Sequence, residues 1–156
     1  MSLDIDALIS NAKKEQAEAG PEELHVLLGG EVVVIRLWPL SGPDWRALFA
    51  KHPPRTMIVD EKPKTLTADV PFGCNIDSLV RDYPRVALVK GDEEQELDKR
   101  TWRRILDVLP ADGISGVAAT AIWLNVAEPA HRHMEAQGKA ARAGEQTKPA
   151  SPDSSE

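Results

Sequence analysis

The sequence predicts a mainly α-helical fold, with one small helical domain over 1–142, a single β-hairpin within it, and a disordered tail over 143–156. Apolar residues recur at helical spacing in several segments, whereas two adjacent β-rich runs with a turn between them occur only once. With 156 residues, the chain has too little length for a second core. From position 143 onward it is polar and contains prolines, so nothing there offsets the entropy of ordering.

Composition narrows the function classes. The net charge of −6 opposes general binding to nucleic acid, whose phosphates would be repelled. The single cysteine, Cys74, forms no intramolecular disulfide, which fits a reducing compartment. The start of the chain lacks the features of a secretion signal, and the longest weakly polar stretch, 116–126, is far shorter than the roughly 20 residues of a membrane span. We therefore expect a soluble protein with no membrane partner.

The first element is a helix that begins after Asp4, a natural N-cap residue. Gly20 and Pro21 end it, because glycine tolerates the left-handed conformation after a helix and proline cannot continue one. Its apolar residues fall on one stripe: Ile5, Leu8, Ile9 and Ala12.

The hairpin is predicted over 23–38. Two β-rich runs are separated by Gly29, Gly30 and Glu31, where the glycines can adopt positive φ. An isolated hairpin is marginal in water, so one face must pack on helices. The expected core face is Leu24, Val26, Leu28, Val33, Ile35 and Leu37.

A second helix is predicted to start at Ser41, which is followed by proline and then by Trp45 at helical spacing, and to end at Pro53. The segment 55–73 has prolines, charges and no sustained period. We expect a flexible loop there that becomes ordered on binding.

The second half is predicted to be helical. Asn75 can cap a short helix, a helix and a strand remain equally open over 85–89, and the acidic segment 92–96 is expected to be a solvated loop. A helical hairpin is predicted over 98–126, with Asp112 as the N-cap of its second helix, and a third helical piece over 129–142. The buried stripe of the first of these helices is Trp102, Ile105, Leu106 and Leu109.

No enzyme or cofactor signature is present. The chain lacks a nucleophile elbow and a phosphate-binding glycine loop, and Cys74 has no activating base nearby in sequence. His131 and His133 point to different sides of a helix, so with Glu135 they make a poor metal site. We therefore expect no catalytic, cofactor-binding or metal-ligating residues.

Protein binding remains as the expected activity. Tryptophan is enriched in binding hot spots, and in a chain with few aromatic residues it is also common in the core. Trp102 is the best core candidate. The candidate partner-binding residues are Trp38, Trp45, Trp123 and Leu124.

Three stretches carry a resemblance to a known family. They are Asn75-Ile-Asp-Ser-Leu-Val-Arg-Asp-Tyr-Pro-Arg, Trp102-Arg-Arg-Ile-Leu-Asp-Val-Leu-Pro, and Ala121-Ile-Trp-Leu-Asn-Val with the later Pro129. Over 75–138 the chain resembles tail assembly chaperones of siphophages that infect actinobacteria. The order of a helix ending in Gly-Pro, a hairpin and a Pro-Leu-Ser-Gly-Pro-Asp-Trp helix start is similar too.

The resemblance implies a protein that binds the tape measure protein, keeps it soluble, and leaves as the tail tube protein polymerises around it. Such a chaperone acts in the cytoplasm of the bacterial host and is absent from the mature virion. The family often makes a longer, frameshifted form, which would be a further partner, and homo-oligomerisation stays open.

Two alternatives remain. The first is a structural virion protein at the tail or the head-tail joint, for which the same protein-binding features would be suitable. The second is a small helix-turn-helix DNA-binding protein, suggested by Arg100, Arg103 and Arg104 beside the helical hairpin. The second helix of that hairpin carries no Lys or Arg, which argues against DNA binding.

Overall fold

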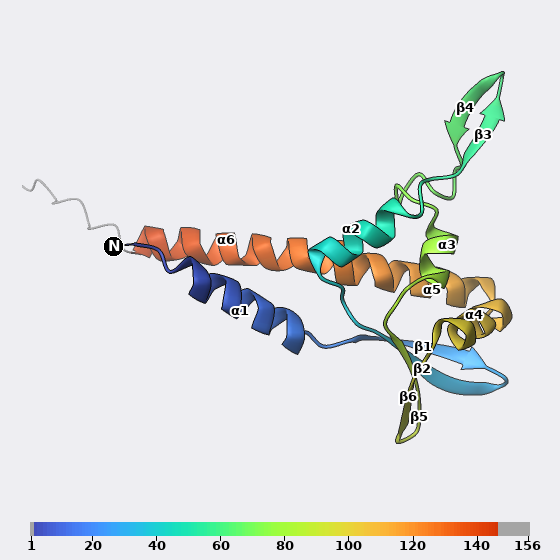
Figure 1. Ribbon diagram of the computed structural model, residues 1–156, viewed down its shortest axis with the longest axis horizontal. Coiled ribbons are helices and arrows are strands. Elements are labelled where there is room, and N and C mark those ends of the chain that lie inside the picture. Colours follow the sequence, from blue (N-terminus) through green and yellow to red (C-terminus); the bar gives the residue numbers. More distant parts are fainter. Residues whose placement is uncertain (1, 147–156) are drawn as a thin grey trace, which may run out of the picture.

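The computed structural model describes residues 2–146 and is 51% helix and 22% strand. A four-stranded antiparallel sheet and a separate two-stranded sheet make the fold mixed α/β, so the prediction of a mainly α protein with one hairpin is wrong. The strands are β1 (Glu22–Leu28), β2 (Glu31–Leu37), β3 (Thr56–Val59), β4 (Lys62–Thr65), β5 (Val86–Lys90) and β6 (Glu93–Glu96). The helices are α1 (Ile5–Glu18), α2 (Gly42–Ala50), α3 (Ile76–Arg81), α4 (Lys99–Val108), α5 (Ala111–Ile122) and α6 (Glu128–Gln146), with a π-helical segment, η1 (Trp123–Ala127), between α5 and α6 (Figure 1).

The predicted hairpin forms the first half of the larger sheet, whose strand order is β1-β2-β5-β6. Leu24 pairs with Ile35 and Val26 with Val33, which places the alternate apolar residues of both strands on one face, as predicted. β5 then pairs with β2 through Leu88 opposite Ile35. This long-range pairing extends a marginal hairpin into a sheet that can be stable on one packed face.

The acidic segment that we expected to be a solvated loop is the edge strand β6. All four of its residues are exposed, and three of them are glutamates. Arg36 crosses the open face of the sheet and binds Glu23 at 2.8 Å and Glu94 at 3.2 Å. Charged side chains of this kind keep a free sheet edge from pairing with other chains.

Helices α3, α4 and α5 cover the apolar face of the sheet. Trp102 is 1% exposed, which confirms it as a core residue, and its Nε1 donates a hydrogen bond to the backbone oxygen of Val80 at 2.8 Å. The helical hairpin predicted over 98–126 is confirmed as α4 and α5, although Pro110 occupies the cap position before α5 and Asp112 lies in the first turn. A Cβ at Gly116 would lie 3.2 Å from the methyl groups of Leu24, so glycine allows α5 to approach β1 closely.

The predicted flexible loop over 55–73 is instead largely structured. Its first part is the β3-β4 hairpin, which projects from the rest of the chain (Figure 1) and turns at Asp60 and Glu61, both with positive φ. The remainder is a set of turns held by Asp69, whose side chain is fully buried. Sequence periodicity missed the hairpin because its turn uses two acidic residues where glycine or asparagine is the usual signal.

Asp69 attaches this arm to the core. Its carboxylate accepts hydrogen bonds from the backbone nitrogen of Arg55 at 2.8 Å, from Nε at 2.9 Å and from Nη2 at 2.7 Å. Arg55 also binds Asp77 at 2.9 Å, at the start of α3. The hydrogen bonds from the Arg55 guanidinium lower the pKa of Asp69 to about 2.

The two terminal helices extend away from the sheet (Figure 1). α1 forms as predicted, yet none of its residues is buried. α6 continues to Gln146, so residues 143–146 of the predicted disordered tail are helical, and 147–156 lie outside the described residues. Within 2–146, no helix is both long enough and apolar enough to cross a membrane.

We predict that Asp69→Asn lowers the free energy of unfolding by about 2 kcal/mol, because the buried charge-assisted hydrogen bonds to Arg55 are lost. The folded pKa lies below the ordinary value of 3.8, so the stabilisation is complete above about pH 4 and is lost as the pH falls toward 2. Urea unfolding as a function of pH measures both effects. The matched control is Asp77→Asn, which removes an exposed partner of the same arginine and should cost less than about 1 kcal/mol. Equal losses in the two variants would contradict this account.

Candidate partner-binding surface

A groove of about 640 Å³ separates α1 from the start of α6. We call it the α1 groove. Its apolar lining comes mainly from the segment after β2, from α2 and from η1: Pro39, Leu40, Trp45 and Leu124. The rim is polar and includes glutamates of α1 and α6. Apolar surface with a charged rim is the usual composition of a protein-binding groove.

Asn125 fixes one wall of the α1 groove. Its Oδ1 accepts a hydrogen bond from the backbone nitrogen of Leu40 at 2.8 Å, and its Nδ2 donates to the hydroxyl of Tyr83 at 2.9 Å. The Tyr83 hydroxyl in turn donates to the backbone oxygen of Trp38 at 2.6 Å. The segment 38–40 is thereby held to the helical layer at two points.

The π-helical segment η1 presents Asn125 to this network. The backbone nitrogen of Glu128 donates to the oxygen of Trp123, five residues earlier, so one residue is inserted into the turn. The Asn125 side chain also donates to the backbone oxygen of Ala121 at 2.8 Å. Insertions of this kind occur frequently at functional sites, where they redirect a side chain.

A second, smaller cavity of about 420 Å³ adjoins the α1 groove, because Trp45 lines both. We call it the Trp45 pocket. Its lining is apolar apart from Arg46, and the rings of Trp45 and Phe49 lie 6.1 Å apart between centroids. Phe72, from the turns held by Asp69, forms the opposite wall.

The four candidate residues do not form one site. Trp45 and Leu124 both line the α1 groove, although Leu124 is only 5% exposed and belongs largely to the core. Trp123 is 42% exposed and lines neither cavity. Trp38 is half-buried, with the Arg85 guanidinium 5.0 Å from its ring centroid in a cation–π contact.

The sequence analysis missed Tyr83 and Asn125, the two residues that shape the groove wall. By spacing, Tyr83 belongs with the apolar positions of the short helix capped by Asn75, and Asn125 lies near the end of the helical hairpin. Apart from the local contact of Asn125 with Ala121, their partners lie 42 to 85 residues away, so no local pattern indicates them. A polar asparagine in an otherwise apolar helical stretch was the one available signal.

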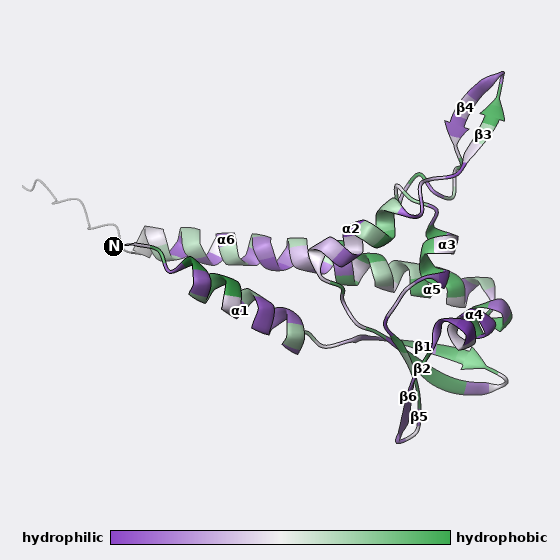
Figure 2. Ribbon diagram, in the orientation of Figure 1, coloured by the Kyte–Doolittle hydropathy of each residue, from purple (hydrophilic) through white to green (hydrophobic). Residues whose placement is uncertain are grey.

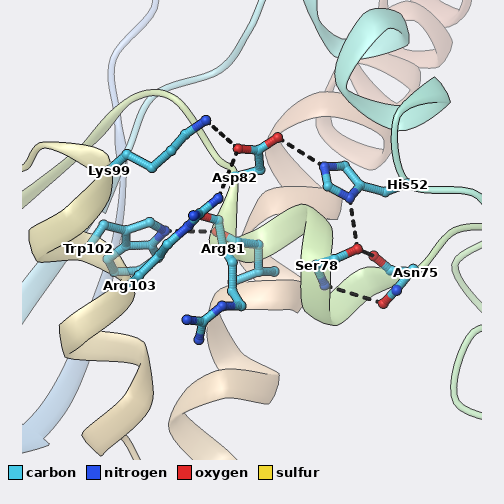
Figure 3. Close-up of polar contacts among 9 residues, drawn as sticks. His52, Asn75, Ser78, Arg81, Asp82, Lys99, Trp102 and Arg103 are labelled. Carbon is cyan, nitrogen blue, oxygen red and sulfur yellow. Dashed lines mark hydrogen bonds and ion pairs between the residues drawn. The ribbon is translucent and has the colours of Figure 1, made fainter.

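The structure also brings together a serine, a histidine and an aspartate (Figure 3). Nδ1 of His52 lies 2.8 Å from Oγ of Ser78, and Nε2 lies 3.1 Å from a carboxylate oxygen of Asp82. Asp82 also binds Lys99 and, at 3.4 Å, Arg103, and the hydrogen bond from Lys99 lowers the pKa of Asp82. The order of the three groups resembles that of a hydrolytic triad.

This polar chain joins three elements of the fold. Neither the α1 groove nor the Trp45 pocket includes His52, Ser78 or Asp82. The Ser78 hydroxyl donates to the backbone oxygen of Asn75 at 3.2 Å, so its proton is directed away from the imidazole. The contacts connect the end of α2 with α3 and α4, which is a structural role.

The other residues that could ligate a metal or act as a nucleophile do not form a site in the described residues either. His131 is 3.6 Å from Glu135, and His133 contacts Gln137 instead. Within residues 2–146, no three His, Cys, Asp or Glu side chains are grouped to hold a metal ion. Cys74 is fully buried, and its burial raises the pKa of the thiol, so it is a poor nucleophile.

Comparison with protein-family models, with curated proteins and with solved structures gave no match to this chain.

We predict that Tyr83, the only tyrosine in the chain, ionises near pH 12, because burial raises the pKa of its hydroxyl to about that value. The folded pKa is above the ordinary value of 10, so the contribution of Tyr83 to the free energy of unfolding falls as the pH rises from 10 toward 12. The absorbance of tyrosinate, followed in the native and the urea-unfolded protein, measures both values. A native midpoint near 10 would show that the hydroxyl is not buried.

We predict that Asn125→Ala lowers the free energy of unfolding by about 2 kcal/mol, because the Tyr83 hydroxyl and the Leu40 backbone nitrogen lose their partner. For a chain of this size the melting temperature should fall by roughly 4–8 °C, as calorimetry would show. The control is Gln137→Ala, an exposed position on α6, with an expected change within about 0.5 kcal/mol. Equal melting temperatures for Asn125→Ala and the unmodified protein would show that the hydrogen bonds of Asn125 do not stabilise the groove wall.

Proposed function

We propose that this chain is a siphophage tail assembly chaperone that binds the tape measure protein and keeps it soluble before the tail tube forms. The resemblance over 75–138 supports this proposal, and these residues build α3 to α6, including the η1 wall of the α1 groove. The proposed place of action is the cytoplasm of the bacterial host.

The observation that carries the proposal is the exposed apolar stripe of α1. Ile5 is 61% exposed, Leu8 59% and Ile9 49%. An isolated helix of 14 residues is marginal in water, and amphipathic helices are normally stabilised by packing of their apolar face. Within 2–146 nothing buries this face, so it fits an apolar helix of a partner.

A long apolar partner is consistent with the rest of the surface. Apolar side chains are exposed on the β3-β4 arm as well, where Ile58 is 72% exposed, and Figure 2 shows β3 as hydrophobic and β4 as hydrophilic. Separate apolar patches on different elements allow several weak contacts along one extended partner, and their combined avidity exceeds that of any single contact.

The structure of α5 does not favour the DNA-binding alternative. Its apolar side is buried against α3 and β1, and its exposed positions include Asp112, Ser115 and Ala119 but no cation. A recognition helix needs polar and basic side chains that reach bases and phosphates. A structural virion protein remains as the second candidate, because the same apolar stripe would suit a permanent interface.

Co-expression with the tape measure protein from the same genome tests the proposal. We expect the tape measure protein to become soluble and to co-purify with this chain, and we expect purified virions to lack the chain by mass spectrometry. The control is an unrelated acidic protein of similar size and charge, which should leave the tape measure protein insoluble.

Two results would contradict the proposal of a chaperone. The first is a tape measure protein that stays insoluble and unbound beside well-folded chain. The second is the chain itself as a stoichiometric component of purified tails, which would establish the structural virion protein instead.

A further inference from the structure

We propose that the α1 groove binds one amphipathic helix of the partner, and that this helix carries Lys or Arg residues beside its apolar stripe. The inference deepens the proposed function, on which it rests for the identity of the partner. It adds the surface, the conformation of the bound segment and its charge.

The exposed stripe of α1 and the lining of the α1 groove belong to one helical face. Ile5, Ile9 and Ala12 are spaced by four and three residues, and the same spacing continues through Gln16 and Ala19. Ala12, Gln16 and Ala19 line the groove. The apolar residues in the first turns of α1 therefore extend the apolar surface of the α1 groove along the helix.

The length and shape of this surface suit a helix. α1 has 14 residues, which corresponds to roughly 21 Å or about four turns. Its apolar side chains form ridges at the spacing that a second helix can interlock with, as in helix-in-groove recognition. The far wall is the start of α6, where Pro129 and Arg132 line the groove.

The charge of the rim specifies a basic segment. Four carboxylates line the α1 groove, on Glu15, Glu18, Glu22 and Glu128, against one cation, Arg132. Arg132 is already paired with Glu128 at 2.7 Å. In the described part of the chain no ion pair neutralises the other three glutamates, so a partner with Lys or Arg at its flanks is electrostatically complementary.

The same charges disfavour other occupants. The α1 helix of a second copy has three acids and two bases, a net charge of −1, so it offers the acidic rim no net positive charge. The whole chain adds repulsion, with its net charge of −6. The segment 147–156 contains no large apolar side chain to fill the stripe.

The test uses the full chain and two synthetic helical peptides with the same leucine stripe, one flanked by lysines and the other by glutamates. Fluorescence anisotropy should give an affinity for the lysine peptide that is about tenfold higher or more, and this preference should weaken as salt is added. Equal affinities, or a preference for the glutamate peptide, would overturn the inference.

Variants locate the binding to the α1 groove. The double reversal E15K/E18K should cancel or invert the peptide preference, whereas the matched reversal E93K/E96K on β6, with the same change in net charge, should retain it. L8Q/I9Q should weaken binding of the lysine peptide about tenfold, and V108Q, at an exposed position on α4, should not. Because α1 has no buried residue, its variants should have the same melting temperature as the unmodified protein.

Two further outcomes separate the inference from the proposed function. If E15K/E18K still solubilises the tape measure protein as well as the unmodified chain does, the proposed chaperone function is supported and the proposed binding site in the α1 groove is wrong. If the lysine peptide binds with the expected variant pattern but the tape measure protein is not bound, the site stands and the chaperone is wrong. A dimer in sedimentation that L8Q/I9Q dissociates would assign the groove to a second copy and overturn the inference.

Discussion

The apolar face of the sheet, built from alternate residues of β1, β2 and β5, is the surface against which α3, α4 and α5 are ordered. Ile35 and Leu37 are fully buried there. On the helical side, Trp102 of α4 is buried and hydrogen-bonds to the backbone oxygen of Val80 in α3. Burial of each large side chain contributes roughly 1.5–3 kcal/mol. The opposite face carries the Arg36 ion pairs, so the sheet has one packed side and one solvated side.

This packed layer also determines the shape of the candidate binding surface. Tyr83 is buried just after α3, and Asn125 lies in η1. Their hydrogen bonds hold the segment 38–40 in place, and that segment is a wall of the α1 groove. On the other side, Asp69 holds the turns that complete the Trp45 pocket. The two cavities therefore depend on buried polar contacts, whereas α1 depends on none.

The parts of the fold that were predictable from the sequence are those with local signals. The α1 stripe, the face of the first hairpin and the buried position of Trp102 all follow from spacing within one element. Over 85–89 the sequence left a helix and a strand equally open, and β5 becomes a strand by pairing with β2, about 50 residues earlier. β6 was missed because an acidic run becomes a strand only by pairing with β5. The observed mixed fold differs from the expected helical one by the long-range β2-β5 pairing and by two local hairpins, β3-β4 and β5-β6, that were not predicted from the sequence.

The candidate site follows the same division. Tryptophan content pointed to Trp45, whose place between two cavities is set by α2, but also to Trp38, which is engaged with Arg85. Residue type alone does not separate a ring that lines a groove from one that is covered by its own chain. The acidic rim was present in the sequence as scattered glutamates, and only the approach of α1 to α6 gathers them.

The separation of α1 from the core has an evolutionary consequence. Most substitutions in a packed element lower stability, and proteins hold little stability in reserve, so changes there are removed by selection. The side chains of α1 make no contribution of this kind, because none of them is buried. Its apolar and acidic positions are thus free to change without loss of stability, and if α1 binds a partner as proposed, related chains can change what they recognise while their sheet and helical layer stay the same.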